Sequence, residues 1–159
     1  MTSQRDLIAR APPVRYTCPA MTPFERNVRA RIYTLLAGGA RRVDAAVLTA
    51  GFGWDTDEVT SALQSLAEEH RIALTEDGEV WMAHPFSGIP TPYRAVIGDR
   101  SWNANCAWDA LAILSLLGDG EARCPGDLVW TVTGGTVSPE GLIHLLVPAR
   151  LFWEDIGFT

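Results

Sequence analysis

Apolar residues in the first half of the chain recur at helical spacing and predict three short helices. The first begins at Thr22-Pro23-Phe24-Glu25, which offers an N-cap threonine, a proline at the first helical position and a glutamate that completes a capping box. It ends at Gly38-Gly39. A second helix is expected near Asp44–Thr49, with a stop at Gly51, and a third begins at Asp55.

Two short strands follow the third helix. Residues Arg71–Leu74 and Val80–Ala83 flank the turn sequence Glu76-Asp77-Gly78, a pattern that predicts a β-hairpin. Three helices followed by a hairpin have the outline of a winged helix. We therefore predict a winged-helix-like lobe over residues 21–84, preceded by an irregular lead-in over residues 1–20.

The second half of the chain predicts a mixed lobe over residues 85–159. Three prolines in His84–Pro92 require extended or irregular backbone, so we place the boundary between the lobes there. One helix is expected at Asn105–Leu117 and a loop at Glu121–Asp127. The predicted strands are Tyr93–Ile97, Leu128–Thr133 and Ile143–Val147. The fold class is therefore α+β, with a helix packed on an antiparallel sheet.

Charge and hydropathy narrow the class of protein. The formal net charge of −6 and the scattered basic residues argue against a nucleic-acid-binding surface. The longest largely apolar stretch, Ala110–Leu117, is far too short to cross a bilayer, so no membrane partner is expected. The first residues lack the pattern of a secretory signal, which predicts a cytoplasmic location.

The three cysteines, Cys18, Cys106 and Cys124, predict neither a disulfide framework nor a structural metal site. Their number is odd, and none belongs to a C-x-x-C pair. The histidines are isolated from one another and from the cysteines, so the spacing of zinc ligands is missing. What remains is the chemistry of single thiols.

Cys106 is the best candidate for a reactive thiol, because it lies in the first turn of the predicted helix. Free backbone N–H groups and the helix dipole favour a thiolate there. Asp109 follows three residues later on the same helix face, so a nucleophile or soft-metal ligand and a proton donor lie together. The same residues also fit a structural role, with Cys106 as a small buried hydrophobe and Asp109 as a complement to the dipole.

The segment Cys106-Ala107-Trp108-Asp109 resembles the Cys-Ala-x-Asp motif that opens a helix in the organomercurial (alkylmercury) lyases. The predicted first lobe resembles the winged-helix-like N-terminal region of that family, and its short actinobacterial-type members are the most similar. Further segments resemble the family in the same order: His84-Pro85-Phe86-Ser87, Ile89-Pro90-Thr91, Arg100-Ser101-Trp102, Ile143–Pro148 and Trp153–Thr159. The resemblance covers residues 21–159.

The resemblance implies cleavage of a Hg–C bond by protonolysis. Cys106 would bind the mercury of R–Hg⁺, and Asp109 would protonate the carbon, so that R–H leaves and Hg(II) remains. No organic cofactor is implied; small-molecule thiols would assist, and the Hg(II) product would pass to a mercuric reductase. Aromatic side chains are expected to line the substrate pocket, with core packing as the alternative role of Trp108: Trp102, Trp108, Phe86 and Tyr93.

The family's second active-site cysteine is expected directly after Phe158-Thr159, where this sequence ends. The second lobe is therefore expected to be truncated, to take its second thiolate from solution, or to have exchanged the mercury chemistry. Cys124 is the less favoured ligand, because a cysteine in a comparable place is regarded as structural in the family. A truncated lobe exposes a sheet edge, which makes a homodimer an expected state.

Two other functions stay open at this point. One is an enzyme on the same scaffold with a mercury-free substrate, in which Cys106 is a covalent nucleophile and Asp109 an acid. The other is a winged-helix DNA-binding protein or thiol-based metal sensor. Against the latter, the third predicted helix and its end carry acidic residues where phosphate contacts need basic ones: Asp57, Glu58, Glu68 and Glu69.

Overall fold

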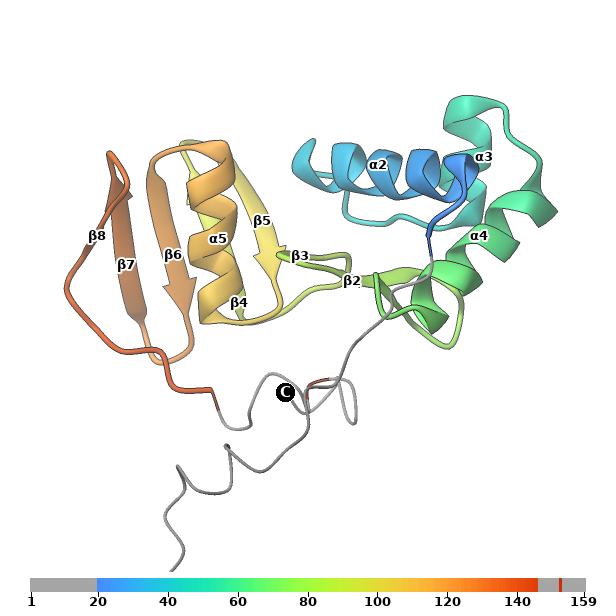
Figure 1. Cartoon of the computed structure of the whole chain (residues 1–159). Helices are drawn as coiled ribbons and strands as arrows, with labels where there is room; N and C mark the ends of the chain where they lie inside the picture. The colour runs from blue at the N-terminus through green and yellow to red at the C-terminus, as the bar shows by residue number, and fades with distance from the viewer. Residues whose placement is uncertain (1–19, 146–151, 153–159) are drawn as a thin grey trace, which may run out of the picture.

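The computed structural model describes residues 20–145 and Phe152. Over this part of the chain there are four helices and one eight-stranded sheet, which confirms the α+β class. Figure 1 shows three helices grouped beside one end of the sheet, while the fourth lies on the face of the sheet.

Helices α2 and α4 begin where their capping residues place them. Helix α2 (Pro23–Ala37) has Thr22 as its N-cap, and the reciprocal bonds between Thr22 and Glu25 confirm the predicted capping box. Helix α4 (Thr56–Glu68) is capped by the side chain of Asp55, which accepts from two backbone N–H groups. Both helix starts were therefore encoded locally.

Helix α3 (Ala45–Phe52) is longer than the sequence pattern predicts. Its N-cap is Asp44, but it continues through Gly51 and ends at Gly53. Gly53 has φ +65°, the left-handed conformation that ends helices and that glycine adopts without steric cost.

One antiparallel sheet extends from the hairpin after α4 to the last described strand. Its order is β1-β2-β3-β5-β4-β6-β7-β8. The strands are β1 (Ala73–Leu74), β2 (Val80–Ala83), β3 (Phe86–Ser87), β4 (Tyr93–Ile97), β5 (Arg100–Ala104), β6 (Gly120–Cys124), β7 (Leu128–Thr133) and β8 (Thr136–Ser138). The predicted hairpin is confirmed, and its strands belong to the same sheet as β4 to β8.

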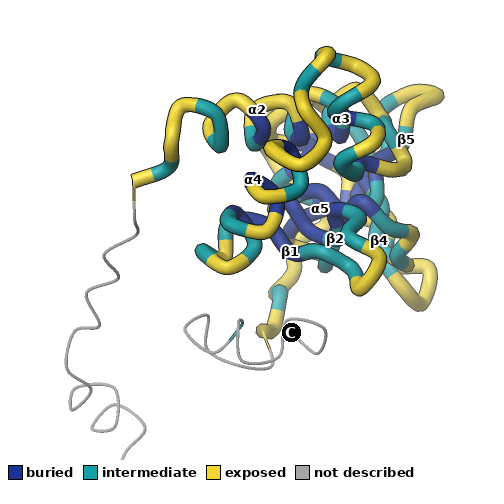
Figure 2. The backbone as a smooth tube through the Cα atoms, turned by 90° about the vertical axis from the view of Figure 1, so that its right-hand side faces the viewer, coloured by how far each residue is buried: buried dark blue, intermediate teal, exposed yellow. Residues whose placement is uncertain are grey.

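Helix α5 (Ala107–Leu117) covers one face of this sheet and completes the core. It packs on β4 and β6, where Ala95 and Ala122 are fully buried. The small side chains let the helix lie close to the strands. Figure 2 shows buried backbone gathered at α5 and along the inner sides of the N-terminal helices, with exposed backbone at the turns.

Trp102 joins the helical half of the molecule to the sheet. Its indole Nε1 donates to the carbonyl oxygen of Ala37, at the end of α2, over 3.0 Å. Arg100 donates to the same oxygen over 3.1 Å, and its guanidinium lies 4.7 Å from the centre of the Trp102 ring. Two side chains from β5 thus satisfy a carbonyl that the helix itself leaves free.

Trp102→Phe is expected to lower the free energy of unfolding by about 1 kcal/mol more than Trp130→Phe does. Both side chains are buried, but the Trp130 indole has no hydrogen-bond partner among the described residues, so the control variant matches the loss of size alone. Urea denaturation followed by far-UV circular dichroism measures the difference. Equal losses for the two variants would contradict the role given to this bond.

The predicted end of α5 at Leu117 is confirmed, but its predicted start and the loop predicted after it are wrong. The helix begins at Ala107 rather than Asn105, because residues 100–104 form β5 and the chain needs two residues to turn onto the sheet face. The predicted loop at Glu121–Asp127 is wrong in its first part, which belongs to β6. Small and charged residues give β6 weak intrinsic β propensity, and pairing with β4 and β7 overrides it.

The end of the described chain also differs from the prediction. Strand β7 is confirmed. Strand β8, which follows the turn at Gly134-Gly135 and pairs with β7, was not predicted. Residues 143–145 of the predicted strand Ile143–Val147 have no regular structure. The lead-in over residues 1–19, the segment 146–151 and residues 153–159 lie outside the described residues, as do the expectations that fall on them.

Candidate active site

The candidate site lies where β5 ends and α5 begins. Cys106 is the N-cap of α5, with extended backbone (φ −152°, ψ −179°), and its carbonyl oxygen accepts the first helical hydrogen bond from Ala110. Asp109 is the third residue of the helix. The side chain of Cys106 is half-buried, and Asp109 is 7% exposed. The turn thus presents a thiol beside a buried carboxyl group.

Two polar side chains hold the Asp109 carboxyl group. Asn105 donates from Nδ2 to Oδ2 of Asp109 over 3.0 Å. Nδ1 of His84 lies 3.2 Å from the same oxygen. The His84 side chain is 45% exposed, against 10% for Asp109, so the imidazole lies between the buried carboxyl group and solvent.

Asn105 connects this carboxyl group to the segment that leads into β3. Its Nδ2 lies 3.3 Å from the carbonyl oxygen of Phe86 and 3.4 Å from that of Pro85. Its Oδ1 is buried and has no partner among the described residues. Asn105 was predicted only as the first residue of the helix. In the structure its side chain orients the Asp109 carboxyl group.

Burial raises the pKa of the Cys106 thiol. The backbone amides of Asp109 and Trp108, at the open end of the helix, act in the opposite direction, and the Asp109 carboxyl group raises the pKa further. Burial is the largest of these effects and outweighs the favourable helix terminus, so the pKa of the thiol is raised rather than lowered.

Alkylation of Cys106 by iodoacetamide at pH 7 is expected to be slower than that of a free cysteine, because a raised pKa leaves less thiolate at a given pH. The rate should rise with pH and level off above the value for the free amino acid. A variant with Cys18→Ala and Cys124→Ala leaves this thiol alone for measurement by intact-protein mass. Faster modification than free cysteine at pH 7 would contradict the burial argument.

The Cys106 thiol opens into a wide apolar hollow of about 1170 Å³. Asp109 and His84 lie on its polar side. The remaining wall includes three tryptophans, two prolines near β3 and residues that follow β8. Among its side chains are Trp81, Trp108, Trp130, Leu111, Ile89 and Leu142. Such a lining suits an apolar ligand with one reactive end.

The aromatic residues expected around the pair divide into two groups. Trp108 lines the hollow and is 63% exposed, so the alternative of core packing is wrong for this side chain. Trp102 and Phe86 are buried where the helical half meets the sheet, and there they line a second, smaller cavity. Tyr93 is half-buried and packs against the core without lining the hollow.

Cys124 lies on the α5 side of the sheet, near the start of that helix. The register Arg94–Arg123 between β4 and β6 places Cys124 beside Tyr93, in line with Ala104 at the end of β5. Burial raises the pKa of Cys124, and the neighbouring Cys106 raises it further. Cys124 is therefore close enough to Cys106 for the two to interact electrostatically, although it does not line the hollow.

The contacts of His84 and Asn105 with Asp109 were not predicted from the sequence. His84 was placed in the connection between the lobes, and Asn105 at the start of the helix. The sequence does not show that the pairing of β3 with β5 brings both side chains to Asp109. Among the described residues no group of three or more histidines, cysteines and acidic residues could hold a metal ion. Nor does any helix there have the length and apolar character needed to span a bilayer.

Residues 86–132, which include Cys106, Asp109 and Cys124, match the sequence pattern of the family described as MerB, alkylmercury lyase. The matched segment covers less than half of the chain, and over it the chain is similar to the alkylmercury lyase family.

A solved structure described as the mercury-bound form of MerB2 has the same fold, with a TM-score of 0.57 and 23% sequence identity. The alignment covers 74% of this chain and 60% of that chain. Comparison with curated proteins gives no match. The segment that matches the family, residues 86–132, contains both Cys106 and Asp109.

Proposed function

We propose that this protein cleaves the Hg–C bond of organomercurials, R–Hg⁺, by protonolysis, with Cys106 as mercury ligand and Asp109 as proton donor. The observation that carries the proposal is the buried Asp109 carboxyl group, held by Asn105 and His84 beside a half-buried thiol. The similarity of residues 86–132 to the alkylmercury lyase family supports the same chemistry.

The protonated thiol suggests where the transferred proton comes from. As the Cys106 sulfur bonds to the mercury of R–Hg⁺, the thiol loses its proton, and the nearby Asp109 carboxylate accepts it. Asp109 then delivers this proton to the carbon as the Hg–C bond breaks and R–H leaves. Hg(II) stays on the Cys106 sulfur, with a second thiolate completing a two-coordinate site.

The apolar hollow gives the organic group a place to lie. Trp108, Leu111 and Ile89 line it, and such side chains bind a hydrocarbon or aryl group by burying it from water. Exclusion of water also strengthens the interaction between the developing charges and Asp109. An aryl or alkyl organomercurial is therefore the proposed substrate.

We further propose that a low-molecular-weight thiol supplies the second thiolate and carries Hg(II) away, for delivery to a mercuric reductase. The hollow is wide enough to admit such a thiol to Cys106. Cys124 is the alternative source, because it lies on the same side of the sheet near the start of α5.

The N-terminal half is proposed to be a winged-helix-like lobe over residues 21–84, ahead of the catalytic lobe over residues 85–159. Helices α2 to α4 with the β1–β2 hairpin support this division. The first turn of α4 carries Asp57 and Glu58, which does not favour a nucleic-acid partner.

The test is release of benzene from phenylmercury by the purified chain in excess small thiol, followed by gas chromatography. Release above the rate of thiol and phenylmercury alone supports the proposal. If no benzene is released, and if the protein instead turns over a mercury-free electrophile that modifies Cys106, the protein is an enzyme on the same scaffold with a different substrate.

His84→Gln is expected to slow steady-state turnover about tenfold while leaving formation of the Cys106–Hg–R adduct unchanged. The reason is that His84 lies between Asp109 and solvent, and a histidine can pass protons near neutral pH. The measurement compares the pH–rate profile with the single-turnover rate, and added imidazole should restore part of the loss. His144→Gln, an exposed histidine outside the site, is the control. Equal turnover in the two variants would remove His84 from the mechanism.

A further inference from the structure

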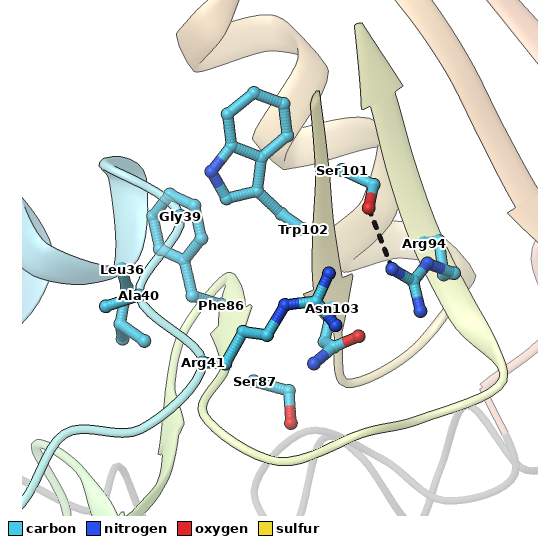
Figure 3. Close-up of a pocket in the computed structure, with 10 residues that line it drawn as sticks. All are labelled: Leu36, Gly39, Ala40, Arg41, Phe86, Ser87, Arg94, Ser101, Trp102 and Asn103. Carbon is cyan, nitrogen blue, oxygen red and sulfur yellow. Dashed lines mark hydrogen bonds between the residues drawn. The ribbon is translucent and has the colours of Figure 1, made fainter. Parts of the chain in front are cut away.

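A second, small cavity lies on the side of the sheet opposite α5. It is bounded by the connection between α2 and α3 and by strands β3, β4 and β5, and its volume is about 20 Å³. That volume holds one group of the size of a water molecule. Figure 3 shows the side chains around it, with the guanidinium groups of Arg41 and Arg94 both directed into the space between the connection and the strands.

Arg41 and Arg94, like Arg26, Arg29, Arg31 and Arg100, lack the carboxylate partners that three other arginines of the described chain have. Arg42, Arg71 and Arg123 each form an ion pair. Among the described residues neither Arg41 nor Arg94 forms one, and none of the residues that line the cavity is acidic. Of the arginines without an ion pair in the described chain, Arg41 and Arg94 are the two that line this cavity.

The other polar groups of the cavity can also donate hydrogen bonds. Nη2 of Arg94 donates to Oγ of Ser101 over 2.7 Å, which leaves the hydroxyl proton of Ser101 free for another acceptor. The Asn103 side-chain amide lines the cavity and has no hydrogen-bond partner among the described residues. Donors therefore outnumber acceptors at this position.

The walls of the cavity are fixed by contacts already described. Trp102 and Arg100 bind the Ala37 carbonyl oxygen, immediately before the connection that carries Arg41. Arg94 and Asn103 are directly paired across β4 and β5. The backbone positions that carry these donors are thus fixed before any ligand arrives, which lowers the cost of ordering the site on binding.

We infer that this cavity binds a small oxyanion, a carboxylate or a phosphate, between the guanidinium groups of Arg41 and Arg94. Guanidinium groups bind such anions through paired N–H donors, and Ser101 and Asn103 add neutral donors. One oxygen fits within the cavity, and the remainder of the anion faces solvent beside the exposed Arg41. Bound there, the anion ties the α2–α3 connection to the sheet.

This inference is independent of the proposed mercury chemistry. Neither Cys106 nor Asp109 lines the small cavity, and neither Arg41 nor Arg94 lines the hollow beside the thiol. Loss of the anion site should therefore leave phenylmercury cleavage measurable, and Cys106→Ser should leave anion binding unchanged.

Titration calorimetry and thermal unfolding with phosphate, and separately with acetate, test the inference at constant ionic strength set by chloride. Phosphate or acetate at ten times its dissociation constant should raise the midpoint of unfolding by about 3–6 °C. Arg94→Gln and Arg41→Gln should each weaken binding about tenfold or more. Arg26→Gln removes the same charge from the exposed face of α2 and should leave binding unchanged.

The two probes also distinguish the source of the oxyanion. Binding of phosphate but not acetate identifies a phosphate ligand, and the reverse identifies a carboxylate. If neither anion binds the wild-type chain, or if Arg26→Gln weakens binding as much as Arg94→Gln and Arg41→Gln do, the inference is overturned. Arg41 is exposed and lies outside the sheet, so the Arg41→Gln variant should fold even if Arg94→Gln disturbs the sheet.

Discussion

Cys106→Ala is expected to lower the rate of benzene release from phenylmercury by about 10³-fold or more. The thiol is the group proposed to bond mercury, and no other cysteine of the described chain lines the hollow that holds it. Alanine fills nearly the same space at the half-buried N-cap, so the fold should remain intact. Activity is measured in excess small thiol, with circular dichroism to confirm folding.

The matched control is Cys124→Ala. If the second thiolate comes from solution, this variant should retain activity within about threefold in excess thiol. A loss comparable with that of Cys106→Ala would instead identify Cys124 as the second mercury ligand. Full activity in Cys106→Ala would refute the role of the thiol altogether.

Asp109→Asn is expected to lower turnover by about 10²–10⁴-fold, the usual contribution of a positioned proton donor. Asparagine keeps the size of the side chain and an oxygen that can accept from Asn105. It cannot carry the proton to carbon, so phenylmercury should accumulate on Cys106 as a stable adduct. Intact-protein mass spectrometry detects this adduct, and gas chromatography measures the missing benzene.

A matched control for this prediction is Asn105→Ala. It leaves the acid in place but removes the 3.0 Å hydrogen bond that orients it, so a smaller loss of about tenfold is expected. The adduct should then turn over slowly instead of accumulating. Rapid benzene release by Asp109→Asn would show that the proton reaches carbon from another donor.

Local signals in the sequence predicted the N-terminal helices well, because caps and turns act within a few residues. Thr22 with Glu25 fixed the start of α2, and Glu76-Asp77-Gly78 fixed the hairpin turn. Strand β6 was missed because its residues favour no strand by themselves; its neighbours β4 and β7 impose the conformation. Tertiary pairing of this kind is not visible in a single sequence.

The candidate site was predictable in part for the same reason. Cys106 and Asp109 are three residues apart, so helical spacing alone brings them together. The contact between His84 and Asp109 spans 25 residues, and it exists because β3 pairs with β5 at Phe86 and Ala104. Only the fold shows that the Asp109 carboxyl group has a histidine beside it.

The continuous sheet sets a limit on how this molecule can move. Strands β2, β3 and β5 share backbone hydrogen bonds across the place where the two halves of the chain meet. Opening the halves as a hinge would break those bonds and also separate His84 from Asp109. Substrate entry and product exit should therefore follow the mouth of the apolar hollow, while the frame around it stays rigid.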